Sequence, residues 1–496
     1  MRTPRRSLAV IAAAALVLIT AQATLAGNPF AKSTTTAGGY HTWDSDLIDI
    51  ENVDQTGAGV YVAVLDTGLT SNWTDYFPKA RVRADLGVGF EQPVNFKAAV
   101  DGKNPCGVEV EKGQLRKTTY IGSRGSTHGT HVASTIIGYS YRANADLAGG
   151  FALPAIQVRG IAPNATIIPV KVLSDYQMPA LPKCPDPLLQ KQGLVVFGTN
   201  EMVAAGIDYV TDLKEGVLKG KPVVINMSLG GAPNEEISVV EMAAINRAIA
   251  AGVIVVAAAS NDGELGMSAP GSYPPVISAG SVGWTGEWLD DGASGNPPAN
   301  GARYRMWWLQ NVRGSGTGTA GNLSALYAGS GDTVEGTAVV DDVYVSDFSS
   351  RERQDVHEQD LDVLAPGSWV RGPYPGDGNY AHLPWWSRGI GDLVGGNPGN
   401  FYYVGGTSMA TPHVASVAAL VLQKNPGLVQ AEVEAILEGS ALPLAPTGSP
   451  LVWDPFNTTT GPGFYSVPWD TDCDGVPCDA VGAGLLQADG AVAATP

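Results

Sequence analysis

The chain has 496 residues, 44% of them hydrophobic and 16% charged, which is typical of a large globular protein with one or two domains. Its formal net charge is −18 at pH 7, and an acidic surface of this kind favours solubility and disfavours binding to nucleic acid. We therefore expect a soluble protein without a nucleic-acid partner.

The first 26 residues have the pattern of a secretory signal. Three arginines within the first six residues precede the apolar run Leu8–Leu18, and small residues follow up to Ala26. The apolar run is too short to span a bilayer well, and no later stretch reaches about 18 uninterrupted apolar residues. The sequence therefore predicts a secreted protein, cleaved after Ala23 or Ala26, without a membrane segment once residues 1–26 are removed.

Four cysteines in an exported chain are available to form disulfides. Cys473 and Cys478 are close neighbours in a turn-rich stretch and are expected to bond to each other. Cys106 and Cys184 then remain as the second pair, which would tie two loop segments together. Neither pair has the C-x-x-C spacing, so zinc and redox roles are disfavoured.

Short, almost uniformly apolar segments alternate with segments of helical periodicity along the rest of the chain. Strands are expected at 60–65, 165–172, 223–226, 253–259, 276–282, 343–349 and 361–366, and helices from 128 and at 201–214, 236–250, 408–423 and 429–438. This alternation predicts an α/β fold with a doubly wound, mostly parallel sheet and helices on both faces. The stretches 70–120, 174–194, 284–345 and 368–404 are expected to be loop-rich.

Two polar residues directly follow buried strands. Asp66 comes at the end of the strand 60–65, and Asn261 follows the strand 253–259. Ligands of doubly wound sheets bind outside the carboxyl ends of the strands. Both residues are therefore expected on the functional edge of the sheet.

Residues 405–414 (Gly-Gly-Thr-Ser-Met-Ala-Thr-Pro-His-Val) predict a tight turn that leads into a buried helix. Ser408 is at the start of this helix, where its hydroxyl and backbone N–H lie beside the positive end of the helix dipole. A serine at such a place is most often only an N-cap. A nucleophilic role requires in addition a base, an acid that orients the base, and donors for an oxyanion.

Among the six histidines, His128 and His131 are the strongest candidates for the base. His413 lies on the Ser408 helix, five residues further along, and is expected to pack or cap locally. A zinc site at His128 and His131 is disfavoured, since the Glu of H-E-x-x-H and a third ligand are missing. Asp66 begins an Asp-Thr-Gly triplet that also occurs in aspartic proteases, but the sequence has no second such motif and no all-β pattern.

Taken together, these residues resemble the subtilisin-like serine proteases, in the same order through most of the mature chain. Segment 64–68 (Val-Leu-Asp-Thr-Gly) resembles the aspartate motif of that family and 128–133 (His-Gly-Thr-His-Val-Ala) its histidine motif. Segment 406–413 (Gly-Thr-Ser-Met-Ala-Thr-Pro-His) resembles its serine motif. The resemblance implies a subtilisin-like peptidase domain.

The resemblance also implies the chemistry of the site. Such an enzyme would be a secreted serine endopeptidase that cleaves proteins or peptides through an acyl-enzyme intermediate. His128 would take the proton of Ser408, and Asp66 would orient His128. No cofactor is implied for the reaction itself.

Shorter matches extend the resemblance to substrate binding. Segment 226–231 (Asn-Met-Ser-Leu-Gly-Gly) resembles the strand whose backbone pairs with the substrate. Segment 257–263 (Ala-Ala-Ala-Ser-Asn-Asp-Gly) resembles the one that carries the oxyanion asparagine, which implies this role for Asn261. The substrate-binding positions implied in this way are Ser228, Leu229, Gly230, Ala258, Ala259 and Ser260.

Some features depart from the family pattern. Ser260 replaces the usual glycine on the wall of the primary specificity pocket, so its side chain is expected to narrow that pocket. The stretches at about 284–345 and 368–404 exceed what the family core needs and are expected to be insertions in a single domain, 27–496.

Structural calcium is the one metal that the sequence brings into question. The family often binds calcium, but its usual calcium loop is altered here at 139–159. The run Asp470–Gly475 begins like an EF-hand loop, yet position twelve would be Val481 in place of Glu. Because Cys473 lies inside this run, an acidic turn closed by a disulfide is an equally good interpretation.

Two rival functions remain to be separated from the peptidase. One is an inactive member of the same fold that only binds peptides, which the complete set of triad and oxyanion residues disfavours. The other is a secreted esterase of the α/β-hydrolase type, which needs a G-x-S-x-G pentapeptide that the sequence lacks.

Overall fold

The computed structural model describes residues 30–496 apart from a set of internal segments. These segments are 31, 40, 100–105, 123–126, 142–146, 149–150, 153–155, 185–189, 191–192, 286–342, 357–358, 375–389, 392–400 and 455–462. The predicted signal (1–26) therefore lies outside the described residues, as do most of the predicted insertion 284–345 and the larger part of 368–404.

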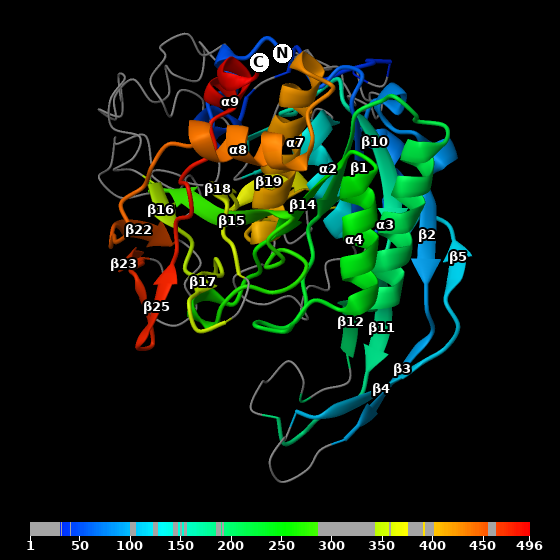
Figure 1. Cartoon of the computed structure of the whole chain (residues 1–496), viewed down its shortest axis with the longest axis vertical. Helices are drawn as coiled ribbons and strands as arrows, with labels where there is room; N and C mark the ends of the chain where they lie inside the picture. Colours follow the sequence, from blue (N-terminus) through cyan, green and yellow to red (C-terminus); the bar gives the residue numbers. More distant parts are fainter. Residues whose placement is uncertain are drawn as a thin grey trace, which may run out of the picture.

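A nine-stranded sheet runs through the part of the molecule that is described (Figure 1). Its strand order is β16-β15-β14-β13-β1-β10-β2-β5, and β18 pairs with β15 in addition. The parallel strands are β1 (Tyr61–Asp66), β2 (Val88–Glu91), β10 (Thr166–Lys171), β13 (Val223–Met227), β14 (Val253–Ala258), β15 (Ile277–Trp284) and β18 (Val363–Pro366). The antiparallel strands at the two ends are β16 (Val343–Val345) and β5 (Arg116–Thr118). The prediction of a mostly parallel sheet is confirmed.

Helices cover both faces of this sheet, as the alternation in the sequence predicts (Figure 1). One face carries α2 (Thr127–Ile137), α7 (Thr407–Lys424), α8 (Gln430–Ser440) and α9 (Ala488–Ala494), and the other carries α3 (Asn200–Glu215) and α4 (Val239–Ala250). Side chains of β1 alternate between the layers, because Val62 and Val64 join the core on the α7 side and Ala63 and Leu65 join the core on the α3 side. None of the helices among the described residues is long and apolar enough to cross a membrane.

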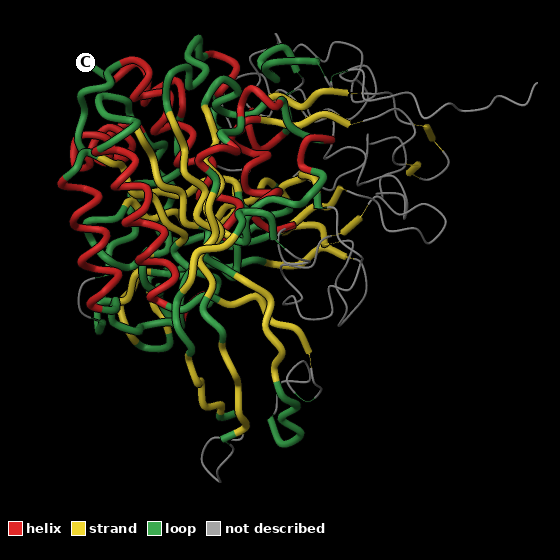
Figure 2. Tube along the Cα trace, turned by 90° about the vertical axis from the view of Figure 1, so that its right-hand side faces the viewer, coloured by secondary structure: helices red, strands yellow, loops and turns green. Residues whose placement is uncertain are grey.

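Two stretches predicted to be loop-rich contain β-hairpins. Strand β3 (Val94–Ala98) pairs with β4 (Val108–Lys112), and β11 (Ser174–Met178) pairs with β12 (Gly193–Phe197). Both hairpins extend beyond the body of sheet and helices (Figure 2). The prediction was wrong here because β3, β4 and β11 are short and interrupted by Asn, Glu, Lys, Asp and Gln, so they lack the continuous apolar run of a buried strand. Strand β12 is apolar throughout, but it begins only at the end of the stretch 174–194.

A disulfide joins the two hairpins. Cys106 in the β3–β4 loop is bonded to Cys184 in the β11–β12 loop, with an S–S distance of 1.93 Å. The rings of Phe96, Tyr176 and Phe197, which come from strands of the two hairpins, also contact one another edge to face, with centroids 5.4–6.2 Å apart. The predicted pairing is confirmed, and the two hairpins joined in this way are called the arm below.

The acidic run 470–475 forms the turn of another hairpin. The predicted disulfide between Cys473 and Cys478 closes it. Oδ1 of Asp470 accepts the N–H of Asp472, and Oδ1 of Asp472 accepts a backbone N–H of the same turn. The structure therefore shows the acidic turn closed by a disulfide, with one oxygen of each of these two carboxylates bonded to the backbone of the turn.

Besides short 3-10 helices at Ile50–Asn52, Trp73–Asp75, Lys79–Arg81, Ala84–Leu86 and Gly263–Leu265, the described chain contains further short elements. They are α1 (Trp43–Leu47), β6 (Gly138–Tyr141), β7 (Leu147–Ala148), β8 (Phe151–Ala152), β9 (Ile156–Arg159), β17 (Glu352–Arg353), β19 (Val370–Pro373), β20 (Ile390–Gly391), β21 (Phe401–Val404), β22 (Leu451–Asp454), β23 (Gly463–Ser466), β24 (Asp472–Cys473) and β25 (Val476–Asp479). Strands β19, β21 and β20 form a small sheet within 368–404, where only irregular chain was predicted.

Candidate active site

The predicted site residues lie where secondary-structure elements begin or end. Asp66 is the last residue of β1, His128 the second residue of α2 and Ser408 the second residue of α7. Asn261 follows β14 after two residues. Since β13 alone separates β1 from β14 in the sheet, the carboxyl ends of these parallel strands meet at one edge. The structure therefore places Asp66 and Asn261 on the predicted functional edge.

Asp66 and His128 form a hydrogen-bonded pair. Nδ1 of His128 lies 2.8 Å from Oδ1 and 3.0 Å from Oδ2 of Asp66. The pair is fixed by its neighbours, because the N–H of Thr67 donates to Asp66 Oδ1 and the N–H of Gly129 donates to Thr67 Oγ1. A Cβ on Gly129 would lie 2.5 Å from the carbonyl oxygen of Gly68, so only glycine allows this approach of α2 to the end of β1.

The environment of the pair changes the basicity of the imidazole. Asp66 is fully buried, whereas 23% of the His128 side chain is exposed. Burial acts to lower the pKa of His128, but the charge of Asp66 and its hydrogen bond act in the opposite direction and hold this pKa above its ordinary value. The pair is thus arranged to stabilise an imidazolium.

Ser408 forms hydrogen bonds with Ser228, the residue that directly follows β13. Its hydroxyl donates to the carbonyl oxygen of Ser228 at 3.2 Å, and the hydroxyl of Ser228 donates to the carbonyl oxygen of Ser408 at 2.8 Å. Among the described residues, Ser408 makes no hydrogen bond to His128. Bonds between a nucleophile and its base are often long without substrate and tighten when substrate binds.

Thr407 fixes the orientation of the Asn261 amide. Oδ1 of Asn261 accepts both the backbone N–H of Thr407 at 2.7 Å and its hydroxyl at 3.1 Å. The Nδ2 group of Asn261 makes no hydrogen bond within the described chain, and neither does the backbone N–H of Ser408 in the first turn of α7. Two donors are therefore available beside the serine.

The chain after β13 offers an unpaired edge. The backbone groups of Leu229 and Gly230 form no hydrogen bond within the described structure, although Gly231 donates to Ala269. A Cβ on Gly230 would lie 2.4 Å from the hydroxyl of Ser268, which is fully buried. An edge with free donors and acceptors is suited to pairing with an extended peptide.

The second predicted substrate-binding segment, 258–260, also contacts Ser268. Ala258 and Ala259 are 2% and 0% exposed, and the N–H of Ser268 donates to the carbonyl oxygen of Ala259 at 3.3 Å. Ser268 therefore connects the segment 258–260 to the segment 228–230. The structure brings the two predicted substrate-binding segments together.

Ser260 has an unusual backbone for a residue with a side chain. Its φ is +94°, in the region that favours glycine. Its hydroxyl donates to Oδ2 of Asp262 at 2.6 Å, and the N–H of Asp262 donates to the hydroxyl of Ser350. The hydroxyl is thus directed to Asp262, and the Cβ is the part of the side chain that remains to narrow the predicted specificity pocket.

His131 is packed inside the fold and contacts the backbone of a neighbouring strand. It is fully buried, and its Nε2 lies 3.0 Å from the carbonyl oxygen of Val370 in β19. His128, for its part, is engaged by Asp66 through Nδ1. One ring nitrogen of each histidine is therefore engaged by a protein oxygen, and the expectation that the two do not form a zinc site stays a prediction.

Sequence reasoning missed two partners in and below the site. Thr407 could have been noticed only as the residue before the serine in the serine motif. Nε2 of His413 lies 3.1 Å from Oδ2 of Asp44, and its Nδ1 lies 2.8 Å from the carbonyl oxygen of Met409. The second contact fits the predicted local role of His413, but Asp44 is 369 residues away in sequence and no local signal indicates it.

Comparisons with known proteins agree with the resemblance in the sequence. The family model described as "Subtilase family" matches residues 57–463. Subtilisin E of Bacillus subtilis (strain 168) is 25% identical over 390 residues, which are 78% of this chain and 61% of that protein. Serine protease AprX of the same strain is 27% identical over 391 residues, 77% of this chain and 61% of that protein.

The share of the relative's own length that this chain matches differs between relatives. Subtilisin BL of Lederbergia lenta is 27% identical over 400 residues, 80% of this chain and 90% of that protein. The chain spans only 61% of the length of Subtilisin E. Among solved structures, fervidolysin from Fervidobacterium pennivorans, described as a keratinolytic enzyme related to subtilisin, matches with a TM-score of 0.47 at 23% identity, over 92% of this chain and 46% of that one.

Proposed function

Because this chain belongs to the subtilase family, we propose that it is a serine endopeptidase that hydrolyses proteins or peptides through Asp66, His128 and Ser408. The observation that carries the proposal is the 2.8 Å contact between His128 Nδ1 and the fully buried carboxylate of Asp66. A carboxylate at Nδ1 fixes the tautomer in which Nε2 is the basic nitrogen, and this nitrogen is the one that accepts a serine proton.

In the proposed reaction, substrate binding draws the hydroxyl of Ser408 away from Ser228 and towards His128. His128 takes the hydroxyl proton while Oγ bonds to the carbonyl carbon of the substrate. The C–N bond then breaks, and His128 gives the proton to the departing amine. Water repeats the two steps on the acyl-enzyme and releases the new carboxylate.

The oxyanion of each tetrahedral intermediate would be held by the Ser408 N–H and by Nδ2 of Asn261. The support for this assignment is that Thr407 occupies the carbonyl end of the Asn261 amide and so directs the donor end away from itself. Donors that are fixed in advance stabilise developing charge without reorganisation.

The substrate backbone would add as a strand to Ser228, Leu229 and Gly230. Its side chain before the scissile bond would pass along Ala258, Ala259 and Ser260. The unpaired backbone of 229–230 and the contact of both segments with Ser268 support this placement.

We further propose that the protein is secreted, on the basis of the signal pattern at 1–26 and the two disulfides, which persist in oxidising compartments. The proposed chemistry uses protein groups alone. Calcium would have a structural role only.

A fluorophosphonate probe tests the assignment of the nucleophile. The parent protein should be labelled on Ser408 alone, and Ser408→Ala should lose both labelling and the cleavage of casein while it remains folded. Ser416→Ala, two turns further along α7 with its hydroxyl bonded to Pro412, is the matched control and should still be labelled.

The rival functions give different results in the same assay. An inactive peptide-binding protein would not be labelled, and an esterase would hydrolyse a short-chain ester but not casein. Labelling at a serine other than Ser408, or casein cleavage by Ser408→Ala, contradicts the proposal.

A further inference from the structure

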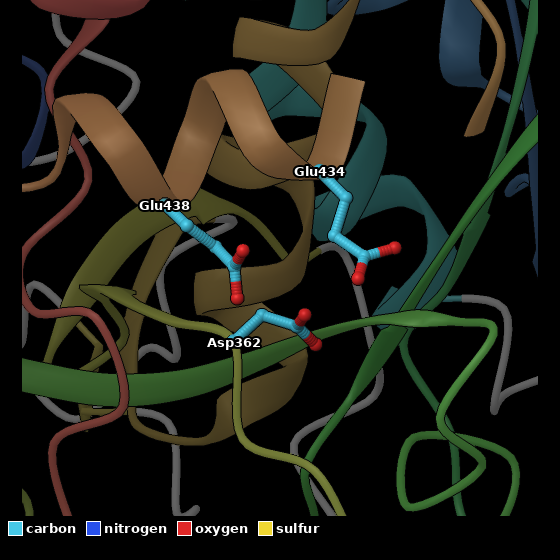
Figure 3. A group of neighbouring side chains, drawn as sticks. All are labelled: Asp362, Glu434 and Glu438. Carbon is cyan, nitrogen blue, oxygen red and sulfur yellow. The ribbon is translucent and has the colours of Figure 1, made fainter. Parts of the chain in front are cut away.

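Three carboxylates from two elements face one another on the side of the sheet that carries α8 (Figure 3). Asp362 directly precedes β18, and Glu434 and Glu438 are one turn apart on α8, so both glutamates lie on one face of that helix. One carboxylate oxygen of each residue lies within 4.8 Å of those of the other two.

Asp362 has one oxygen in use and one without a partner. The side chain is 1% exposed. Its Oδ2 accepts the backbone N–H of Ser278 at 2.7 Å and the Ser278 hydroxyl at 2.8 Å. Its Oδ1 is buried and has no hydrogen-bond partner in the described structure. A buried carboxylate oxygen without a partner is costly, so the site calls for a positive or hydrogen-bonding group that these residues do not supply.

The described protein provides no cation for this group. No Lys, Arg or His among the described residues forms an ion pair with Asp362, Glu434 or Glu438. Burial, followed by the charges of neighbouring carboxylates, raises the pKa of Asp362 to about 8 and that of Glu434 to about 7, and the pKa of Glu438 is raised as well. Like charges held this close resist ionisation unless a cation neutralises them.

The helix adds to the same imbalance. Glu438 lies in the last turn of α8, where the helix dipole is negative, and that turn contains no basic residue. Carboxylates are unfavourable at this end of a helix, and a cation is favourable there. The helix dipole and the charges of the three carboxylates therefore both favour a cation at the last turn of α8.

We propose that Asp362, Glu434 and Glu438 bind a divalent cation, and that this cation is calcium. All the ligands are carboxylate oxygens, which hard cations prefer. Calcium binds oxygens at about 2.3–2.6 Å, so two oxygens on one ion can be up to about 5 Å apart, which suits a group within 4.8 Å. Magnesium requires about 2.0–2.1 Å and near-ideal octahedral geometry, and zinc prefers nitrogen and sulfur ligands.

A cation at this place would connect α8 to the strand that supports the serine turn. Strand β18 ends at Pro366, and the carbonyl oxygen of the next residue, Gly367, accepts the N–H of Gly406 at 2.8 Å. Gly406 is two residues before Ser408. The expected role is therefore to stabilise this part of the fold, without participation in the chemistry.

Thermal unfolding and isothermal titration calorimetry of the full-length Ser408→Ala protein, which cannot digest itself, test the site. Calcium at about a hundredfold above its Kd should raise Tm by roughly 3–8 °C relative to EDTA. Glu434→Gln and Glu438→Gln in the same background should lose most of this shift and bind one calcium fewer. In EDTA both variants should be at least as stable as the parent, because one repelling charge is gone.

Glu432→Gln is the matched control. Glu432 is exposed on the same helix and accepts the N–H of Val429 at the helix start, a role that glutamine also fulfils. This variant should keep the full calcium shift. Equal shifts in all four proteins, or no calcium binding by the parent, would overturn the proposed site, and a larger shift with magnesium than with calcium would overturn the choice of metal.

Discussion

At the scale of single residues, the site depends on side chains that fix the orientation of other side chains. Thr407 binds the carbonyl end of Asn261 through two hydrogen bonds, and Asp66 binds the Nδ1 side of His128. In this way Thr407 leaves Nδ2 of Asn261 as the free hydrogen-bond donor, and Asp66 leaves Nε2 of His128 as the free nitrogen. The chemistry of such a site is therefore sensitive to residues that need not touch the substrate.

Removal of the proposed oxyanion donor should affect turnover more than binding. Asn261→Ala should lower kcat by about 10²–10³ with little change in KM, which is the effect measured when an oxyanion-hole asparagine is removed from a subtilisin. Thr407→Val should give a smaller loss of the same kind, because the backbone N–H still holds Asn261. Thr411→Val, which removes a hydroxyl bonded within α7, is the control and should leave kcat unchanged. A loss that is mainly in KM would assign Asn261 to ground-state binding.

The Asp66–His128 pair predicts the pH dependence of activity. Asp66 holds the pKa of His128 above 6.5, so the neutral base is lost, and kcat/KM falls, as the pH decreases through that raised value. Asp66→Asn should lower kcat by roughly 10⁴. It should also move the acid limb of the profile, the fall of kcat/KM at low pH, to lower pH, because burial then lowers the pKa of His128 without the opposing effect of Asp66. Asp44→Asn, in the second His–Asp pair, should not move the limb.

The raised pKa of His128 also makes the stability of the fold depend on pH, but this contribution decreases as the pH rises, whereas activity increases. A raised pKa in the folded state means that protonated His128 stabilises the fold. This contribution is fully present below the pKa of the unfolded chain and is lost as the pH rises through the folded-state value. An acid limb that stays in place in Asp66→Asn would contradict the role given to Asp66.

Ser260 predicts a preference for medium-sized apolar residues before the scissile bond. Its Cβ takes space that glycine would leave open, and its positive φ costs on the order of 1–3 kcal/mol. The charge of Asp262, which accepts the Ser260 hydroxyl, would attract basic residues of a substrate by only about 0–1 kcal/mol. This is less than the roughly 1–3 kcal/mol that a methylene fit contributes. In a peptide library, Ser260→Gly should shift the preference towards Phe and Tyr, whereas Ser260→Ala, which keeps Cβ, should not. A parent enzyme that already prefers Phe and Tyr would contradict the idea.

At the scale of elements, a second buried His–Asp contact ties the start of the described chain to the helix of Ser408. His413 on α7 is fully buried, and Asp44 on α1 is 6% exposed. This contact lies five residues beyond Ser408 and gives α7 a fixed position. It therefore acts on the site through packing, and its role is separate from that of Asp66.

Loss of the Asp44 carboxylate should destabilise the fold by about 1–3 kcal/mol, because the buried Nε2 of His413 would be left without its hydrogen-bond partner. Urea unfolding of Asp44→Ala in the Ser408→Ala background measures this loss. Below the unfolding midpoint, Asp44→Ala with Ser408 intact should still react with the fluorophosphonate probe. An unchanged midpoint would show that the contact contributes nothing.

The elements also show how far sequence reasoning reaches. Buried strands such as β1 and β14 were predicted within one residue at each end, because their apolar runs are continuous and both sheet faces are covered. The hairpins β3–β4 and β11–β12 were missed, since exposed antiparallel strands depend on their pairing partner and on a disulfide. Motif order indicated the residues of the site, but the contact of Ser408 with Ser228 depends on packing between elements 180 residues apart.

At the scale of the whole molecule, the two disulfides restrain very different lengths of chain. Cys106 and Cys184 are 78 residues apart in sequence, and the loop that they close includes α2 and β10. Cys473 and Cys478 are 5 residues apart and close a single hairpin. In the chain-entropy model a cross-link stabilises mainly by restricting the unfolded chain, and more so for a longer loop.

The two bonds should therefore contribute unequally to stability. The model gives about 4.5 kcal/mol for the long loop and about 2 kcal/mol for the short one. Cys106→Ser with Cys184→Ser, and separately Cys473→Ser with Cys478→Ser, should be compared by urea unfolding in the Ser408→Ala background, which prevents self-digestion. The first pair of changes should lower the free energy of unfolding more than the second by roughly 2 kcal/mol. Since the long loop contains His128 but its disulfide lies in the projecting arm, labelling of folded protein with Ser408 intact should persist in both variants. Equal losses would mean that the arm opens locally while the rest of the fold stays intact, so that the long loop does not restrain global unfolding.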